Sequence, residues 1–362
     1  MRKIWKKSSI VKAICPLRVD LSGMTDYIQA QGSCVNSTIG LIARLSLSAR
    51  TDKKITVDAG SYGIETFSLD EIPTNKNMFA RALDLVGYTK AFDFGMDVKV
   101  DCEYGAIGLS SSSSVGAMYY RAAELIMNQP NDPLEVAKAT QAIEPHWYGR
   151  QDQLAVAFGG FNLWRMTAGK VVKDKAIEFG QVERFPIFLP ESRLSLLAEE
   201  SFLLYHSGIE EGAKGVLDNI ITNYESNKAL KDVFKKMSNL AEEVYSILLA
   251  GSKDEKWLGD LGETFDEIRA AHEKLHPTVT NERMRALFAA AKRAGALGGR
   301  YSGAGGRGAL TFICRPGDRA KIAAALSKIR VPYTTEKGVV FDEGRQIHFG
   351  GFNRYGATAW FA

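Results

Sequence analysis

The feature that most constrains the fold is a strictly alternating stretch that runs into a serine loop. Hydrophobic and polar residues alternate over 92–102, and a period of two predicts a half-buried β-strand. Glycines and then five serines, at 110–114, follow this stretch. Hydrophobic residues then recur at helical spacing over 115–127, and Asn-Gln-Pro at 128–130 is a stop signal. The predicted order is strand, glycine–serine loop, helix.

The rest of the chain places strands first and helices later. We predict a strand at 38–50, a turn and hairpin within 155–182, helices such as 226–250 and 262–276, a glycine-rich loop at 298–308, a strand at 309–314 and a helix at 318–329. This order favours an α+β fold over a doubly wound sheet. Pro186 and Pro190 flank a short strand, so we expect two domains, residues 1–188 and 189–362.

Composition narrows the possible partners. The net charge is only +4, with 46 basic and 42 acidic side chains, and no basic block is present, so nucleic acid is not expected as a partner. No segment reaches the roughly 20 apolar residues that span a membrane. The four cysteines lack CxxC spacing, which is typical of reduced thiols in a cytoplasmic protein. A small anionic molecule remains the expected ligand.

The glycine–serine loop is a candidate phosphate site. Backbone N–H groups at a helix N-terminus favour anions, and serine hydroxyls cap such a terminus or bind a magnesium ion. The loop does not fit the Walker A pattern, because no lysine follows the glycine. Serines that merely cap a helix are the plainer interpretation of this loop.

Four segments resemble conserved motifs of the GHMP kinases. Residues 108–113 (GLSSSS) resemble the central signature P-x-x-x-G-L-G-S-S-A/S, and residues 14–27 resemble the N-terminal motif A-P-G/L-R-x-x-L-x-G-x-x-T-D-Y. Residues 298–306 (GGRYSGAGG) resemble the C-terminal motif K-x-S-G-A-G-G-G-G. Residues 149–162 are similar to the G-x-Q-D-Q-Y-A-A-A-F-G-G-x-N run of the heptose-7-phosphate kinases. The resemblance extends over about residues 10 to 330.

This resemblance implies a two-domain GHMP-kinase-like fold. The N-terminal domain is expected to hold a mixed sheet with helices, and the C-terminal domain to be an α/β sandwich. ATP and Mg²⁺ would occupy a site between the two domains. The reaction implied is transfer of the γ-phosphate of ATP to a hydroxyl of a sugar or sugar phosphate, with heptose 7-phosphate at its anomeric hydroxyl as the leading candidate. The protein would act as a monomer or homodimer.

The same resemblance assigns candidate site residues. Asp152 is the expected base for the acceptor hydroxyl, and Arg18 is its expected partner. The residues expected to bind the nucleotide are Gly108, Leu109, Ser110, Ser111, Ser112 and Ser113. Ser112 or Ser111, together with Glu144, would bind magnesium. The residues expected to bind substrate are Asp26, Arg150, Gly303, Ala304, Gly305, Gly306 and Arg307, with His146, Trp147 and Tyr148 beside them.

Several positions depart from the family motifs. Tyr104 stands where the phosphate-loop motif has proline, Ala106 and Ser110 stand where it often has glycine, Met24 replaces a small residue or His, and Arg307 replaces a glycine. These departures leave open a GHMP-fold regulator that binds a nucleotide or sugar without turnover. The T-D-Y and G-x-Q-D-Q runs argue against an isoprenoid-pathway kinase, and the near-neutral charge argues against a nucleic-acid binder of the same ancestral fold.

Overall fold

The computed structural model of the protein describes residues 5–6, 9–23, 31–60, 63–105, 107–145, 149–167, 179–210, 214–227, 229–250, 255–335, 338–340 and 343–362. The strands are β1 (Ile10–Asp20), β2 (Gly32–Ala49), β3 (Lys54–Asp58), β4 (Ile64–Ser68), β5 (Met96–Asp101), β6 (Phe161–Thr167), β7 (Gln181–Ile187), β8 (Phe202–His206), β9 (Gly298–Tyr301), β10 (Ala309–Ile313), β11 (Tyr333–Thr335), β12 (Gly338–Val340), β13 (Arg345–Ile347) and β14 (Thr358–Phe361). The helices are α2 (Met78–Leu85), α3 (Ser111–Met127), α4 (Pro133–Ile143), α5 (Gln151–Phe158), α6 (Glu191–Ser195), α7 (Lys214–Ser226), α8 (Leu230–Ala250), α9 (Lys256–Glu273), α10 (Glu282–Arg293) and α11 (Arg319–Leu326). Short helical turns are η2 (Leu69–Glu71), η3 (Tyr88–Lys90), η4 (Leu196–Ser201) and η5 (Pro277–Val279).

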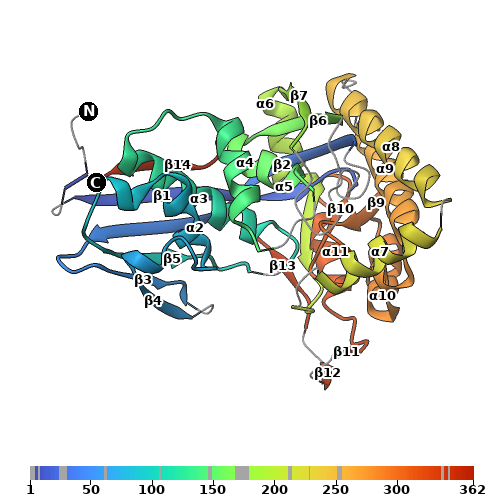
Figure 1. Ribbon diagram of the computed structural model, residues 1–362. Helices are drawn as coiled ribbons and strands as arrows, with labels where there is room; N and C mark the ends of the chain where they lie inside the picture. Colours follow the sequence, from blue (N-terminus) through green and yellow to red (C-terminus); the bar gives the residue numbers. More distant parts are fainter. Residues whose placement is uncertain are drawn as a thin grey trace.

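An eight-stranded sheet forms the first of two lobes. Its main path runs β14-β1-β2-β5-β3-β4, and β6 continues from the other half of the long strand β2 to pair with β7. All neighbours are antiparallel except β3 and β5. Figure 1 shows β1, β3, β4, β5 and β14 on the left, with α2, α3 and α4 beside them, whereas β6 and β7 lie nearer the second lobe. The long β2 therefore carries the sheet from one lobe toward the other.

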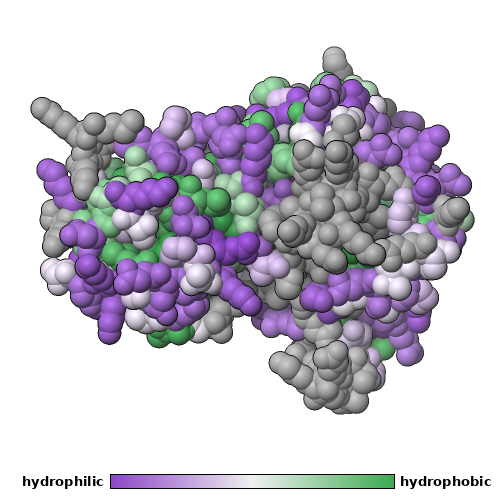
Figure 2. Space-filling view, in the orientation of Figure 1, coloured by the Kyte–Doolittle hydropathy of each residue, from purple (hydrophilic) through white to green (hydrophobic). Residues whose placement is uncertain are grey.

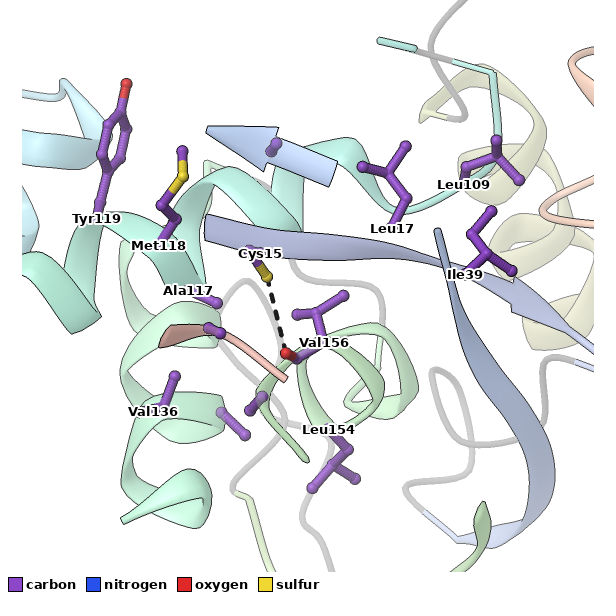
Figure 3. Close-up of a cluster of buried hydrophobic side chains, with 14 of the residues drawn as sticks. Cys15, Leu17, Ile39, Leu109, Ala117, Met118, Tyr119, Val136, Leu154 and Val156 are labelled. Atoms are coloured by element: carbon purple, nitrogen blue, oxygen red, sulfur yellow. Dashed lines mark hydrogen bonds between the residues drawn. The ribbon is translucent and has the colours of Figure 1, made fainter. Parts of the chain in front are cut away.

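The core of the first lobe lies between β1 and the helices. Alternate residues of β1, from Val11 to Val19, are buried, as a period of two requires for one packed face. Figure 3 shows Cys15 and Leu17 of this face among side chains of α3, α4 and α5. The Cys15 thiol donates to the Val156 carbonyl over 3.7 Å, and all four cysteines are unbridged.

A second lobe combines a small sheet with a layer of helices. The sheet order is β13-β8-β10-β9, all antiparallel, and α9 packs against β9. Figure 1 shows α7 to α10 along the outer side of this lobe. In Figure 2 the visible surface over these helices is mostly hydrophilic, whereas hydrophobic side chains gather over the first lobe. Such amphipathic helices bury their apolar face against the small sheet.

The lobes meet where β1 ends. At this end of β1 both faces are buried, so that Arg18 and Asp20 are 3% and 2% exposed. The pairing of β1 with β2 shifts register between Pro16 and Arg18, and the Arg18 N–H donates to the Leu109 carbonyl of the serine loop over 3.1 Å. An irregularity of this kind turns a side chain toward a site.

One expected strand is shorter than predicted. The alternation over 92–102 predicted a continuous strand, but β5 covers only Met96–Asp101. Gly95, directly before the strand, packs closely on the backbone of Lys54, because a Cβ at this position would lie 1.8 Å from the Lys54 carbonyl oxygen. Phe92 and Phe94 are buried in a loop before the strand, so their spacing reflects core packing rather than pairing.

The C-terminal residues, whose place the sequence left open, complete both sheets. β13 pairs with β8, and β14 pairs with β1 at the edge of the first sheet. The strand β14, near the end of the chain, thus lies in the sheet of the first lobe. The boundary between residues 188 and 189 stays a prediction. Within the part of the chain that the structure describes, no helix has the length and apolarity needed to cross a membrane.

Candidate active site

Arg18 links the segments that the motifs predicted to meet. Its Nε and Nη2 donate to Oδ1 of Asp152, at 2.9 and 2.6 Å. Its Nη1 donates to the carbonyls of Gly108 and Ser302, at 3.0 and 2.7 Å. One buried guanidinium thus joins the end of β1, the serine loop, the start of α5 and the glycine loop after β9.

The charge on Arg18 is maintained by neighbouring carboxylates. Burial opposes the charge, but Asp152 and then Asp20 offset this effect and raise the pKa of Arg18 above its usual value. Nη2 lies 3.4 Å from Oδ2 of Asp20, which is buried, whereas the Asp152 side chain is 30% exposed. Asp152 is therefore the carboxylate of this pair that a ligand can reach.

The serine loop enters α3 through a strained residue. Ser110 has φ 58° and ψ 36°, the left-handed region, and its buried Oγ has no hydrogen-bond partner in the described part of the chain. Ser112 is exposed at the start of the helix, while Ser114 is buried and donates to the Pro16 carbonyl over 2.9 Å. The predicted nucleotide-binding segment is thus a helix N-terminus anchored on β1, with Ser112 on its outer side.

Glu144 lies against the serines, as the sequence predicted. Ser113 Oγ donates to Glu144 Oε1 over 2.9 Å, Ser112 also hydrogen-bonds this carboxylate, and Gln153 Nε2 donates to Oε2. Burial raises the pKa of Glu144 to about 7, although the bonds from Gln153 and the serines favour the charged form. Oε1 of Gln153 is buried and has no hydrogen-bond partner among the described residues, so several oxygen atoms that suit a hard cation lie close together here.

The glycine loop contacts the serine loop through Gly303. A Cβ on Gly303 would lie 3.0 Å from the Cα of Gly108, so the two backbones touch at this point. Gly305 and Gly306 instead approach η5, because a Cβ on either would lie 2.7 or 2.5 Å from a carbonyl oxygen of that turn. Ala304 is buried. Of this predicted substrate segment, Gly303 is therefore the residue in contact with the phosphate-loop candidate.

Two predicted substrate arginines point elsewhere. Arg150 is fully buried and donates to the Phe179 carbonyl over 2.7 Å. The guanidinium of Arg307 lies beside Gly215 of α7, where a Cβ would be 3.9 Å from Nη2. Within the described residues, these contacts of Arg150 and Arg307 lie away from Arg18, and their role in substrate binding stays a prediction. Asp26, Met24, Ala106, His146, Trp147 and Tyr148 lie outside the described residues.

Sequence reasoning missed several polar residues of the site. Asp20 follows Arg18 by two positions, and this spacing places two side chains on one face of a strand, so the pattern contained the signal. Gln153 stands inside the Q-D-Q run, but the resemblance assigned it no role. Arg300, a buried arginine on β9, matches the lysine of the C-terminal motif, and nothing in the sequence indicated its burial. Among the described residues, no cluster of three or more His, Cys, Asp or Glu side chains forms a metal site.

Comparison with known families agrees with this arrangement. The family description "GHMP kinases N terminal domain" matches residues 77–160, and "GHMP kinases C terminal" matches residues 241–330. The first range holds the serine loop and Asp152, and the second holds the glycine loop. The chain therefore has the N-terminal and the C-terminal domain of the GHMP kinases.

Individual relatives are kinases of several substrates. The chain is 23% identical over 368 residues to D-glycero-alpha-D-manno-heptose 7-phosphate kinase of Campylobacter jejuni, which covers 97% of this chain and 98% of that protein. It is 24% identical over 238 residues to mevalonate kinase of Pyrococcus horikoshii, across 64% of this chain and 63% of that protein.

Solved structures confirm the α+β two-domain fold. A D-glycero-D-manno-heptose 1-phosphate kinase from Bacteroides thetaiotaomicron superposes with a TM-score of 0.72 at 19% identity, covering 97% of this chain and 98% of that chain. Lactococcus lactis galactokinase complexed with galactose gives a TM-score of 0.70 at 16% identity, covering 98% and 96%. At these identities the likeness concerns the fold.

Proposed function

We propose that this protein is a kinase that transfers the γ-phosphoryl group of ATP to a hydroxyl of a sugar or sugar phosphate. The observation that supports it best is the Arg18 network. One buried cation holds a part-exposed carboxylate, Asp152, next to a helix N-terminus suited to phosphate. A GHMP-fold regulator without turnover has no need for this pairing.

The residues can divide the work of the transfer between them. Both Arg18 bonds end on Oδ1 of Asp152, so we assign Oδ2 to the proton of the acceptor hydroxyl. The deprotonated oxygen bonds to the γ-phosphorus as the bond to the β-phosphate oxygen breaks, and ADP leaves. Arg18 offsets the negative charge that develops on the transferring group. The amides of residues 110–113 hold the nucleotide phosphates.

A magnesium ion fits the corner around Glu144. The Glu144 carboxylate, the Ser112 hydroxyl and the buried Gln153 Oε1 are hard oxygen ligands, and Mg²⁺ takes a small number of such ligands from a protein. These residues would hold the ion, and a bound Mg²⁺ would neutralise phosphate charge.

For the acceptor we propose D-glycero-D-manno-heptose 7-phosphate, phosphorylated at its anomeric hydroxyl. The G-R-Q-D-Q run supports this choice, as does the relative from Campylobacter jejuni, whose likeness extends over 97% of this chain. Mevalonate is the second candidate acceptor, because the other curated relative is a mevalonate kinase.

The test is an ADP-release assay with ATP and Mg²⁺ against heptose 7-phosphate, galactose, other sugars and mevalonate. We expect turnover on one acceptor, and a loss of at least about 100-fold in kcat for Asp152→Asn, because a general base contributes that much or more. Asp84→Asn, at an exposed position on α2, is the matched control and should keep wild-type turnover.

Calorimetric titration with ATP separates the remaining outcomes. Binding of ATP without turnover on any acceptor would contradict the kinase proposal and favour the regulator, which the Arg307 and Tyr104 departures motivate. Equal turnover in wild type and Asp152→Asn would contradict the role of Asp152 while leaving a kinase in place.

A further inference from the structure

Asn36, a buried residue of β2, donates a hydrogen bond to the first residue of α5. Its Nδ2 lies 3.1 Å from the Gln151 carbonyl oxygen, and both residues are buried. Gln151 directly precedes Asp152, the carboxylate that Arg18 holds. The position before the helix is Arg150 rather than a serine, threonine, aspartate or asparagine, the residue types that usually fix a helix start. The amide of Asn36 therefore anchors the helix turn that carries Asp152.

The indole of Trp164 on β6 fixes which way the Asn36 amide points. Trp164 Nε1 donates to Oδ1 of Asn36 over 3.0 Å. An indole N–H can only donate and a backbone carbonyl can only accept, so the amide has its oxygen toward Trp164 and its amino group toward Gln151. Asn36 is 0% exposed, so both bonds lie away from water, where they are strongest. A buried amide with both ends used in this way has a single orientation.

A second asparagine holds the opposite end of α5. Asn162 on β6 pairs with Asn36 in the register of the sheet. Its Nδ2 donates to the carbonyls of Gly159 and Gly160, at 2.9 and 3.2 Å, and its Oδ1 accepts from Arg184 Nε over 2.6 Å. The two ends of this eight-residue helix are thus anchored by amides of two paired residues of the sheet. Only the Asn36 anchor adjoins the proposed base.

We infer that Asn36 is a positioning residue for the transfer reaction: its amide, oriented by the neighbouring indole, holds Asp152 in reach of Arg18. The inference rests on the proposed function. Two bonds from Arg18 end on Oδ1 of Asp152, at 2.9 and 2.6 Å, and such a fork tolerates little displacement of the helix start. Asn36 acts through Gln151 and needs no contact with nucleotide or acceptor. The serine loop has its own anchors on β1, so nucleotide affinity should not depend on Asn36.

The test compares Asn36→Leu with Asn162→Leu, because each replaces a buried amide at one end of α5 by an apolar side chain of the same branching. We expect kcat to fall about 100-fold in Asn36→Leu, the effect of a displaced catalytic group, with the KM for ATP within about threefold of wild type. In Asn162→Leu, kcat should stay within about threefold of wild type. Trp164→Phe keeps the amide and an aromatic ring but removes the orienting bond, so its kcat should fall about tenfold.

A second readout does not depend on turnover. The ¹⁵N–¹H signal of Arg18 Nε reports its bond to Asp152. It should shift in Asn36→Leu and in Trp164→Phe, and stay in place in Asn162→Leu. An unmoved signal with wild-type kcat in Asn36→Leu would overturn the inference, even with the kinase proposal intact. Equal losses of kcat in the two leucine variants would also overturn it, since that is the result of a generally loosened α5.

Two further outcomes are decided by the same measurements. If Asn36→Leu does not fold, Trp164→Phe takes its place, and an unmoved Arg18 signal with wild-type kcat in that variant would overturn the inference. A wild type without turnover contradicts the proposed function instead, and the Arg18 signals of the variants then decide the inference alone.

Discussion

Ser110 holds a backbone conformation that favours glycine, at the point where the serine loop enters α3. With φ 58° and ψ 36° it is one of two described residues other than glycine with positive φ, the other being Asn128. We expect Ser110→Gly to raise the free energy of unfolding by roughly 0.5–1 kcal/mol, because the left-handed penalty of a side chain exceeds the added entropy of the unfolded chain. Chemical denaturation measures the change.

Asn128→Gly is the matched control for this prediction. Asn128 ends α3 with φ 53°, and asparagine tolerates this region better than serine. The free energy of unfolding should therefore rise less in Asn128→Gly than in Ser110→Gly. A destabilised Ser110→Gly would mean that the buried Ser110 hydroxyl has a stabilising role that outweighs its strain.

His272 predicts how stability responds to acid. Burial lowers its pKa to about 3, and the charge of Arg300 adds to the effect. Between pH 6.5 and 3, His272 is protonated in the unfolded chain but stays neutral in the folded protein. The free energy of unfolding therefore falls as the pH falls, by about 1.4 kcal/mol per pH unit at most. His272→Gln should reduce this slope in denaturation curves recorded across that range. If the free energy of unfolding depended on pH in the same way in wild type and His272→Gln, the role of His272 would be contradicted.

At the scale of elements, the contact between the two glycine-containing loops is sensitive to a single methyl group. A Cβ on Gly303 would lie 3.0 Å from Gly108 Cα, so Gly303→Ala should force the glycine loop and the serine loop apart. We expect about a tenfold loss in kcat/KM for ATP, because the Arg18 bonds to Gly108 and Ser302 span the same contact.

Gly259→Ala provides the control on a helix. Gly259 lies in α9, and a Cβ there would meet no atom within 4 Å. This variant should gain up to about 1 kcal/mol in helix stability and keep wild-type kinetics. Steady-state kinetics on both variants tests the prediction, and equal kcat/KM values would contradict the role of the loop contact.

Some of the elements could be predicted from the sequence, and the assembly of the site only in part. The spacing of hydrophobic residues located α3, β2, α8 and β10, because each of these elements packs one face against the core and its buried residues recur at the spacing of a helix or a strand. It failed at 92–95, where hydrophobic residues are buried by packing in a loop. The motifs brought Arg18, Asp152 and Glu144 to one region, yet they did not reveal that Arg150 turns into the fold.

Arg300 shows why the remainder escaped prediction. Its guanidinium is fully buried, with Cζ 5.9 Å from the ring of Phe265 on α9, a residue well before Arg300 in the sequence. A local sequence pattern cannot predict contacts between segments that are distant in sequence. The roles of the site residues accordingly stay predictions until kinetics tests them.

At the scale of the whole molecule, β14 closes the edge of the first sheet. Its residues pair with β1, Val11 facing Phe361, and the ring of Phe361 lies 6.3 Å from that of Trp5. Deleting residues 358–362 should lower the free energy of unfolding by about 3 kcal/mol, through lost strand pairing and exposure of Val11. It should also promote association, since β1 becomes an unprotected edge.

Thermal unfolding and light scattering measure the two effects. Trp360→Ala, at a side chain that is 39% exposed, should change neither by much and serves as the control. A truncated protein with wild-type stability would show that β14 is an accessory strand.

The pairing of β1 with β14 also has a consequence for how the protein is made. β1 pairs with β14, and the second lobe lies between these strands in the sequence, so β1 leaves the ribosome well before its outer neighbour. Until then the nascent first lobe exposes an open strand edge, of the kind that chaperones shield. Slower elongation along the second lobe would lengthen this exposed period, so translation speed bears on the yield of folded protein.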